Sequence, residues 1–361
     1  MSFYLEKDYF ADEALLELVN RVMQGDLTLH WYEAKTERVR AVPKNTQRGL
    51  TYEDTNLGSY GYDAIPEILR NKYTMAARGS EIWGRLPDLG YTINRKSDVW
   101  SENVARLYEE SKSRRWAPAV DVPWDELGRR KLTTEIEAAV AQLSTTLEEI
   151  ALVGLEMPSR WVFAINQEFL EMKSFLCAQM LDQARHLEAF RKRALAGGQG
   201  LKRASVAAEQ ALKEILFAET YPAASLSMNL MLGSALLTLY RFCAAISPSA
   251  VERRIFAFAM QDKARHVAYG MGHMRYHLAH QPRQRDVLGD YLDRTEHCLL
   301  GVLAAPELVE PLALLARGRV SVSRFYETAI GEYLERCVSV GFTDRRSRSR
   351  LAQTLRQIVA A

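Results

Sequence analysis

The sequence predicts an all-α protein whose long helices form a bundle. From about residue 133 almost to the end of the chain, apolar residues recur at helical spacing, and Pro and Gly interrupt that pattern at only a few points. No stretch of any length alternates as a strand would, and no repeat of 20–50 residues is found. Apolar residues make up 48% of the 361 residues, so a sizeable core can be buried.

The long helices are expected to pair as two hairpins. We expect helices at about 133–164, 168–196, 202–246 and 250–280, and shorter ones near 284–304, 311–338 and 346–360. Pro158 should kink the first helix, and Pro222 should bend or break the third. Gly197 and Gly198 should end the second helix, and Pro248 marks the turn of the second hairpin. Two such hairpins with flanking helices form a bundle.

The chain divides into two parts on this basis. Residues 1–98 are predicted to be a partly irregular N-terminal extension with one short amphipathic helix at 12–23. Residues 99–361 are predicted to be the helical domain, with its core at 133–281. A helix is expected at 98–113, after which Pro118 and Pro123 exclude a continuous helix.

Charge and composition argue against nucleic-acid and membrane partners. The net charge is +2 with acids and bases interspersed, and the basic cluster around 345–350 is interpreted as a solvated helix start. Residues 226–246 are long and apolar enough to span a bilayer, but they contain Asn229 and Arg241, which favours a buried bundle helix. The acidic N-terminus lacks the pattern of a signal peptide. The four cysteines form no CxxC and are predicted to be buried thiols of a cytoplasmic protein.

The same five-residue pattern, Asp-x-Ala-Arg-His, occurs on two of the predicted core helices. The two copies are Asp182-Gln183-Ala184-Arg185-His186 and Asp262-Lys263-Ala264-Arg265-His266. In each copy the Asp and the His lie one helical turn apart and share a face. A buried imidazole needs a partner that selects its tautomer, and a buried Asp or Arg needs a counter-charge. We therefore expect two reciprocal ion pairs in the middle of the core, Asp182 with Arg265 and Asp262 with Arg185.

These two segments resemble the D-E-x-R-H helices of the ferritin-like di-iron carboxylate oxygenases, among them bacterial multicomponent monooxygenase hydroxylases and amino-arene N-oxygenases. The resemblance covers roughly residues 133–281 and implies a ferritin-like helical bundle. In that family two helices each supply a Glu, two others each supply Glu-x-x-His, and paired irons activate dioxygen. The resemblance also implies that Asp182, Arg185, Asp262 and Arg265 act as outer partners of the ligands.

The metal-ligand positions depart from the family pattern. The two motifs read Gln183-x-x-His186 and Lys263-x-x-His266, so both histidines remain and both motif carboxylates are missing. A neutral amide is a poor ligand for a hard cation, and a protonated lysine has no lone pair. A lysine at this position therefore disfavours divalent ions.

The two upstream carboxylates must lie level with Gln183 and Lys263 across each hairpin. With the first turn near residue 166, the level position is Glu149; the usual offset of the family points nearer 153, and Glu149 and Glu156 share that face. We therefore expect a carboxylate near the site from this helix. With the second turn near residue 248, the level position is near Gly233, which offers no ligand.

Three kinds of centre follow from these departures. We favour a core without metal or other cofactor, in which Lys263 replaces the metal charge and pairs with Glu149 or Glu156. Some metal-free relatives in the ribonucleotide-reductase branch of the superfamily are similar, with Lys in place of a ligand. The alternatives are a single iron held by His186, His266 and one of those acids, and an ordinary di-iron site.

Three functions remain open on the sequence. The first is a pseudoenzyme, either a homodimer or a ferritin-like subunit beside an active oxidative enzyme. The second is an oxidoreductase or oxygenase that acts on a small organic substrate through an atypical centre. The third uses Lys263 as a base or nucleophile, because burial lowers a lysine pKa. Candidate catalytic residues are Lys263, His186, His266 and Tyr269. The pair His273 and His277 has metal-binding spacing, but histidines near a helix C-terminus also interact well with its dipole.

Overall fold

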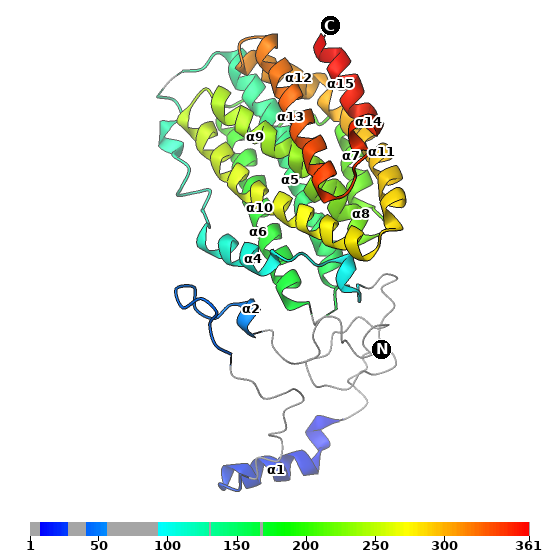
Figure 1. The fold of residues 1–361 in the computed structure, drawn as a ribbon. Coiled ribbons are helices and arrows are strands. Elements are labelled where there is room, and N and C mark those ends of the chain that lie inside the picture. Colours follow the sequence, from blue (N-terminus) through cyan, green and yellow to red (C-terminus); the bar gives the residue numbers. More distant parts are fainter. Residues whose placement is uncertain (1–7, 28–40, 56–92, 130, 167–168, 361) are drawn as a thin grey trace.

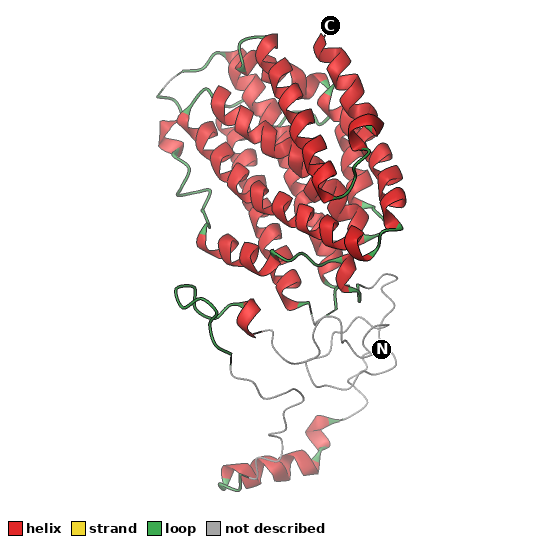
Figure 2. Cartoon of the chain, in the orientation of Figure 1, coloured by secondary structure: helices red, strands yellow, loops and turns green. Residues whose placement is uncertain are grey.

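A computed structural model describes residues 8–27, 41–55, 93–129, 131–166 and 169–360. Within these ranges the protein is helical, and the only extended pairing is an isolated bridge between Ile93 and Ile165. Figures 1 and 2 show the helices gathered into one bundle. The predicted all-α bundle is confirmed.

The first core hairpin agrees closely with prediction. It consists of α5 (Thr134–Val162) and α6 (Leu170–Ala196), which pack along each other. Pro158 lies inside α5 without ending it. The chain leaves α6 through Gly197 and Gly198, and Gly198 has a φ of 73°, a value that favours glycine.

The second core hairpin is built differently from the predicted single helix 202–246. That segment forms α7 (Val206–Leu216), α8 (Tyr221–Ser225), a π-helical stretch Leu226–Leu232 and α9 (Gly233–Ile246). The chain breaks before Pro222, where the Thr220 hydroxyl accepts a hydrogen bond from Ala223 N and caps the new helix. The returning helix, α10 (Ala250–His280), has the predicted bounds.

The C-terminal helices cover the second hairpin. They are α11 (Gln284–Leu303), α12 (Pro306–Leu315), α13 (Arg319–Val340), α14 (Arg345–Arg348) and α15 (Arg350–Ala360). One helix was predicted over 311–338, but Arg317 and Gly318 adopt φ values of 55° and 150° and separate α12 from α13.

The described parts of the N-terminal extension hold α1 (Glu13–Met23), capped by Asp12, and the short α2 (Tyr52–Thr55). α1 buries no residue, and Figure 1 places it away from the bundle. α4 (Val104–Ser113) begins six residues later than predicted. Much of the predicted extension lies outside the described residues, and the domain boundary at residue 98 stays a prediction.

By length and composition, two of the described helices could cross a membrane. These are α5 and the continuous stretch Tyr221–Ile246, and the bent pair α11–α12 would make a third. Of the most apolar window, 72% of the residues are buried in α5 and 67% in Tyr221–Ile246. Packing inside the bundle therefore accounts for their apolar composition. The cysteine prediction holds for three residues, since Cys243, Cys298 and Cys337 are buried thiols, but Cys177 is exposed.

Arg345 corrects the interpretation of the C-terminal basic cluster. Its side chain is 1% exposed and donates to Glu296 at 2.8 Å and to Asp293 at 2.7 Å. Tyr333 and Ser349 also donate to Glu296, at 2.5 and 2.7 Å. This buried cluster fastens α13 and the last helices to α11.

We expect Arg345→Met to lower the free energy of unfolding by about 3 kcal/mol or more, because Glu296 would stay buried without its counter-charge. The measurement is urea denaturation followed by circular dichroism. Arg348→Met is the matched control: its side chain is 31% exposed, and its pairs with Asp290 and Asp293 should contribute at most about 1 kcal/mol. Equal losses in the two variants would contradict a buried anchor at Arg345.

Candidate functional site

The two Asp-x-Ala-Arg-His segments meet in the middle of the bundle, where α6 lies against α10. Six side chains form what we call the frame, and none exposes more than 7% of its surface. They are Asp182, Arg185 and His186 from α6, and Asp262, Arg265 and His266 from α10. Six polar residues at this depth are stable only if they satisfy one another.

The predicted reciprocal ion pairs are present. Arg265 donates to Asp182 at 3.0 Å, and Arg185 donates to Asp262 at 3.3 Å. Each arginine also contacts the aspartate of its own helix. Burial by itself would raise the pKa of Asp262, but the hydrogen bond from His186 and the charge of Arg265 hold it below its usual value. The four groups close a ring in which two positive and two negative charges cancel.

The ring also selects the tautomer of both histidines. His186 Nε2 lies 3.1 Å from Asp262 Oδ2, and His266 Nε2 lies 3.0 Å from Asp182 Oδ2. An ionised carboxylate only accepts, so each Nε2 carries the hydrogen and each Nδ1 keeps a lone pair. Burial lowers the pKa of His266 to about 4 and also lowers that of His186, so both rings are neutral. His186 Nδ1 is buried and has no hydrogen-bond partner in the described residues.

Trp116 completes the frame and was not identified from the sequence. Its indole N–H donates to Asp262 Oδ2 at 2.8 Å, and its ring stacks on His186 with centroids 6.2 Å apart. It lies in the segment that Pro118 and Pro123 keep from being helical. A tryptophan beside such a proline-rich loop was the available signal, but it does not say which helix the ring contacts.

Gly154 and Met228 lie beside Gln183, at positions other than those where the upstream carboxylates were expected. A Cβ built on Gly154 would lie 2.7 Å from Gln183 Cδ and 2.8 Å from Met228 Cε. Position 154 of α5 therefore faces Gln183, and Met228 borders the same space from the π-helical stretch. A glycine inside a long helix costs stability relative to alanine, and that was the overlooked signal.

The expectation of a nearby carboxylate from α5 was wrong. Glu156 follows Gly154 by two residues, about 200° around the helix, and is exposed. Glu149 precedes Gly154 by five residues, about 140° around, and is half-buried. Both therefore project away from the face that meets Gln183. Gly233 was expected to lie level with Lys263, but a Cβ built on Gly233 would lie 3.0 Å from Val267, one turn further along α10.

Lys263 lies next to the ring as an additional cation. It is 1% exposed, and across the described ranges it forms no hydrogen bond or ion pair, so the predicted pairing with Glu149 or Glu156 was wrong. Burial lowers its pKa to about 8, although the charges of Asp262 and Asp182 oppose that shift. Because the ring is already neutral, Lys263 adds one uncompensated positive charge to the core.

These residues do not fit a carboxylate-bridged pair of metal ions. Gln183, Lys263, Gly154 and Met228 supply no carboxylate, and both aspartates of the frame are engaged by arginines. Of the two imidazole Nδ1 atoms that could bind a metal, that of His266 lies 3.3 Å from Gln183 Nε2, and that of His186 has no partner among the described residues. In the part of the chain that the structure describes, no group of three or more His, Cys, Asp or Glu is placed to hold a metal ion.

Tyr269 and the histidines beyond it belong to a different region of α10. The Tyr269 hydroxyl donates to Val99 O at 2.9 Å and pairs with the Tyr221 hydroxyl at 2.7 Å. Neither partner belongs to the frame. His273 uses both ring nitrogens, one with Ser225 Oγ and one with Asp98 O. The i,i+4 pair His273 and His277 therefore offers no two-nitrogen metal grip.

Comparisons with known proteins identify the class of fold. No protein-family model and no curated protein matches the sequence. The solved structures that match include an R2-like ligand-binding oxidase with an aerobically reconstituted Mn/Fe cofactor, which is 21% identical. The match has a TM-score of 0.52 and covers 66% of this chain and 93% of the oxidase.

Two variants of an R2-like ligand-binding oxidase match equally well. One, with an anaerobically reconstituted Mn/Fe cofactor and a tyrosine replaced by phenylalanine, is 21% identical with a TM-score of 0.53. The other, with a valine replaced by alanine, is 22% identical with a TM-score of 0.52; each match covers 66% of this chain and 94% of the oxidase. The chain therefore has the ferritin-like fold of these oxidases, as the sequence resemblance implied.

The buried ammonium of Lys263 gives a stability prediction. We expect Lys263→Met to stabilise the protein at pH 7 by on the order of 1–3 kcal/mol, because it replaces a buried unpaired charge with an apolar chain of similar volume. The folded-state pKa of about 8 lies below the ordinary 10.5, so the unfolded chain binds more protons between these values. Wild-type stability should therefore gain a contribution as pH rises from 8 to 10.5, and the variant should lack it.

Chemical denaturation at a series of pH values measures both effects. Lys192→Met is the control, because Lys192 is 42% exposed on α6, and its effect should stay within about 0.5 kcal/mol. Destabilisation by Lys263→Met at pH 7 would show that the ammonium has a compensating partner.

The ring gives a coupling prediction. Arg265→Leu and Asp182→Asn should each lower the free energy of unfolding by about 3 kcal/mol or more, since each leaves buried charge uncompensated. The double variant should lose clearly less than the two single losses added together, with a coupling of about 1–3 kcal/mol. A double-mutant cycle by urea denaturation measures it, and strict additivity would contradict the pairing.

Proposed function

We propose that this protein is a ferritin-like pseudoenzyme with a metal-free core, which acts as a partner subunit in an oxidative small-molecule pathway. The observation that carries the proposal is Lys263, a buried cation at the ligand position of the α10 motif. Gln183 occupies the same position on α6, and Gly154 and Met228 line the space opposite. A divalent ion placed among these groups would meet an ammonium and no carboxylate.

The retained frame supports a structural role for these residues. Asp182, Asp262 and the two arginines satisfy one another without any metal, and each aspartate also orients a histidine. Such a ring can hold two hairpins together after the ligands are lost, whereas a lone buried aspartate could not. The pseudoenzyme proposal thus explains why the six frame residues are present although both motif carboxylates are absent.

The other two functions have weaker support. An oxidoreductase with an atypical iron centre is favoured by the fold shared with Mn/Fe oxidases and by the unpartnered Nδ1 of His186. Use of Lys263 as a base or nucleophile is disfavoured by access. Lys263 is 1% exposed, so its amine is not open to a substrate from solvent.

The partner in this proposal is a ferritin-like subunit or a second copy of the chain, in the cytoplasm. Support comes from α1, whose apolar side chains are not covered by the rest of the described chain: Leu16 is 54% exposed, Val19 50% and Met23 81%. An unburied apolar helix face is typical of a protein contact.

Metal content tests the proposal. The chain is loaded with ferrous iron or Mn²⁺ without oxygen, desalted, analysed for metal per chain and then exposed to air. We expect no stoichiometric metal and no oxygen-dependent absorbance. One or two ions per chain, lost in His186→Ala or His266→Ala, would overturn the metal-free core and favour an oxygen-using enzyme.

A restoring variant serves as the positive control. Gln183→Glu with Lys263→Glu removes the repelling cation and adds two carboxylates. It also removes the contact between Gln183 Nε2 and His266 Nδ1, which are 3.3 Å apart in the wild type. We expect this double variant to gain one bound ion per chain, measured in the same assay. Only one is expected, because Gly154 and Met228 still supply no bridging ligand.

A further inference from the structure

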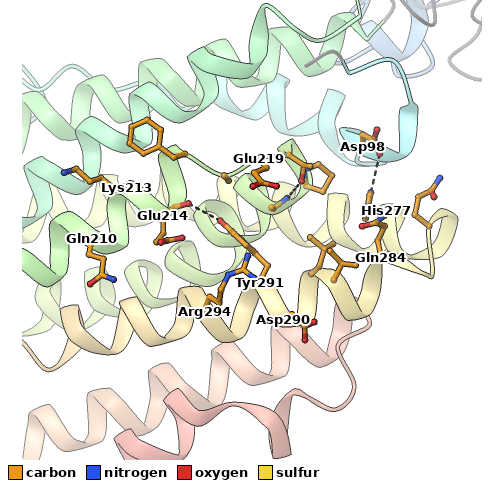
Figure 3. A pocket seen from close by; sticks show the side chains of 18 of the residues that line it. Asp98, Gln210, Lys213, Glu214, Glu219, His277, Gln284, Asp290, Tyr291 and Arg294 are labelled. Atoms are coloured by element: carbon orange, nitrogen blue, oxygen red, sulfur yellow. Dashed lines mark hydrogen bonds and ion pairs between the residues drawn. The ribbon is translucent and has the colours of Figure 1, made fainter. Parts of the chain in front are cut away.

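A large cavity among the described residues lies away from the frame. Its volume is about 1120 Å³, and it opens between α7, the loop that leads to α8, and α11, with the C-terminal end of α10 at one side. Figure 3 shows Glu214, Tyr291 and Arg294 along it, and His277 and Asp98 at one end. Cavities of this size hold small organic molecules.

His277 places a buried acceptor at that end of the cavity. The residue is 3% exposed, and its Nδ1 lies 2.8 Å from Ser97 O. A carbonyl oxygen only accepts, so Nδ1 carries the hydrogen and Nε2 has the lone pair. Burial lowers the pKa of His277, which keeps the ring neutral. Nε2 has no hydrogen-bond partner in the described chain, and leaving a buried acceptor unsatisfied is costly.

A second acceptor lies on the Nδ1 side of the same imidazole ring. Asp98 Oδ1 is 3.8 Å from His277 Nδ1, and the Asp98 side chain is 23% exposed in the same cavity. The Tyr291 hydroxyl, which could have donated, already bonds to Glu214 O and Ser227 Oγ at 3.2 Å each. This end of the cavity therefore presents two acceptors to a ligand.

The charged residues that line the cavity also favour a cationic ligand. The lining residues Glu209 and Lys213 pair with each other, and Asp290 pairs with Arg348. The remaining charged lining residues are Asp98, Glu214 and Glu219 against Arg95 and Arg294. Arg294 lies over the Tyr291 ring, 5.6 Å from its centroid. The balance is one excess negative charge, which suits a cationic ligand.

The cavity also has an uncovered apolar wall. Phe217 is 67% exposed and Val287 is 60% exposed, and both line the cavity together with Leu288. Large apolar side chains left open beside convergent polar groups are characteristic of ligand sites.

We propose that this cavity binds a small protonated amine with an alkyl or aryl body. The ammonium donates to His277 Nε2 and Asp98, and the apolar body covers Phe217 and Val287. A carboxylate head would instead meet the Nε2 lone pair and the Asp98 carboxylate. The site is separate from the frame, since His277 follows His266 by 11 residues, about 16 Å along α10. The proposal therefore does not depend on a metal-free core.

Three probes of equal body size test it with the full-length chain: 2-phenylethylamine, 2-phenylethanol and 3-phenylpropanoate, each titrated by calorimetry at pH 7. We expect the amine to bind at least about tenfold more tightly than the alcohol, and the carboxylate to bind most weakly. Carboxylate binding as tight as the amine, equal affinity for amine and alcohol, or no binding of the amine would each overturn the proposal.

Variants locate the site. His277→Phe and Asp98→Asn should each weaken amine binding by about tenfold or more. Asp98→Asn keeps the test decisive if the buried His277→Phe variant fails to fold. His280→Phe is the matched control, because His280 is exposed one turn further along α10 and does not line the cavity, so its affinity should equal wild type. Unchanged affinity in folded variants of both Asp98 and His277 would place the amine elsewhere and overturn the assignment.

Discussion

The ring of Asp182, Arg185, Asp262 and Arg265 is the interaction on which the rest of the core depends. Each arginine bonds to the aspartate of its own helix and to that of the other helix, so the contact between α6 and α10 has one register in which all four charges are satisfied. Sliding either helix by a turn would leave ionised groups buried without partners, which is far more costly than an apolar mismatch.

The same ring determines the chemistry that the centre can perform. It fixes the hydrogens of both imidazoles on Nε2 and leaves the Nδ1 atoms as acceptors, an arrangement suited to metal binding. Gln183 and Lys263 stand next to these imidazoles in sequence, Gly154 and Met228 lie beside Gln183, and none of the four side chains is a carboxylate. The four charges of the ring balance one another without a metal ion.

α10 joins two regions of different character. Near its middle it carries the frame, whose two positive and two negative charges cancel and whose side chains are buried. Near its C-terminus His273 and His277 bond to the backbone carbonyls of residues 98 and 97, which fastens the segment before α4 to the bundle. His273 is fully satisfied, whereas His277 keeps a free acceptor, and this difference distinguishes packing from a binding site.

The sequence by itself determined the helical class, the positions of most core helices, the four-charge ring and the presence of Gln183 and Lys263 in the two Asp-x-Ala-Arg-His segments. These follow from the 3.6-residue period and from the need of buried charges for partners, both of which are readable within a few turns. Only the tertiary structure decided that Gly154 and Met228 border Gln183, that Glu149 and Glu156 turn away, and that Trp116 closes the frame. Those facts depend on how one helix is set against another. The break before Tyr221 and the π-helical stretch alter that register by amounts that spacing along one chain segment does not reveal.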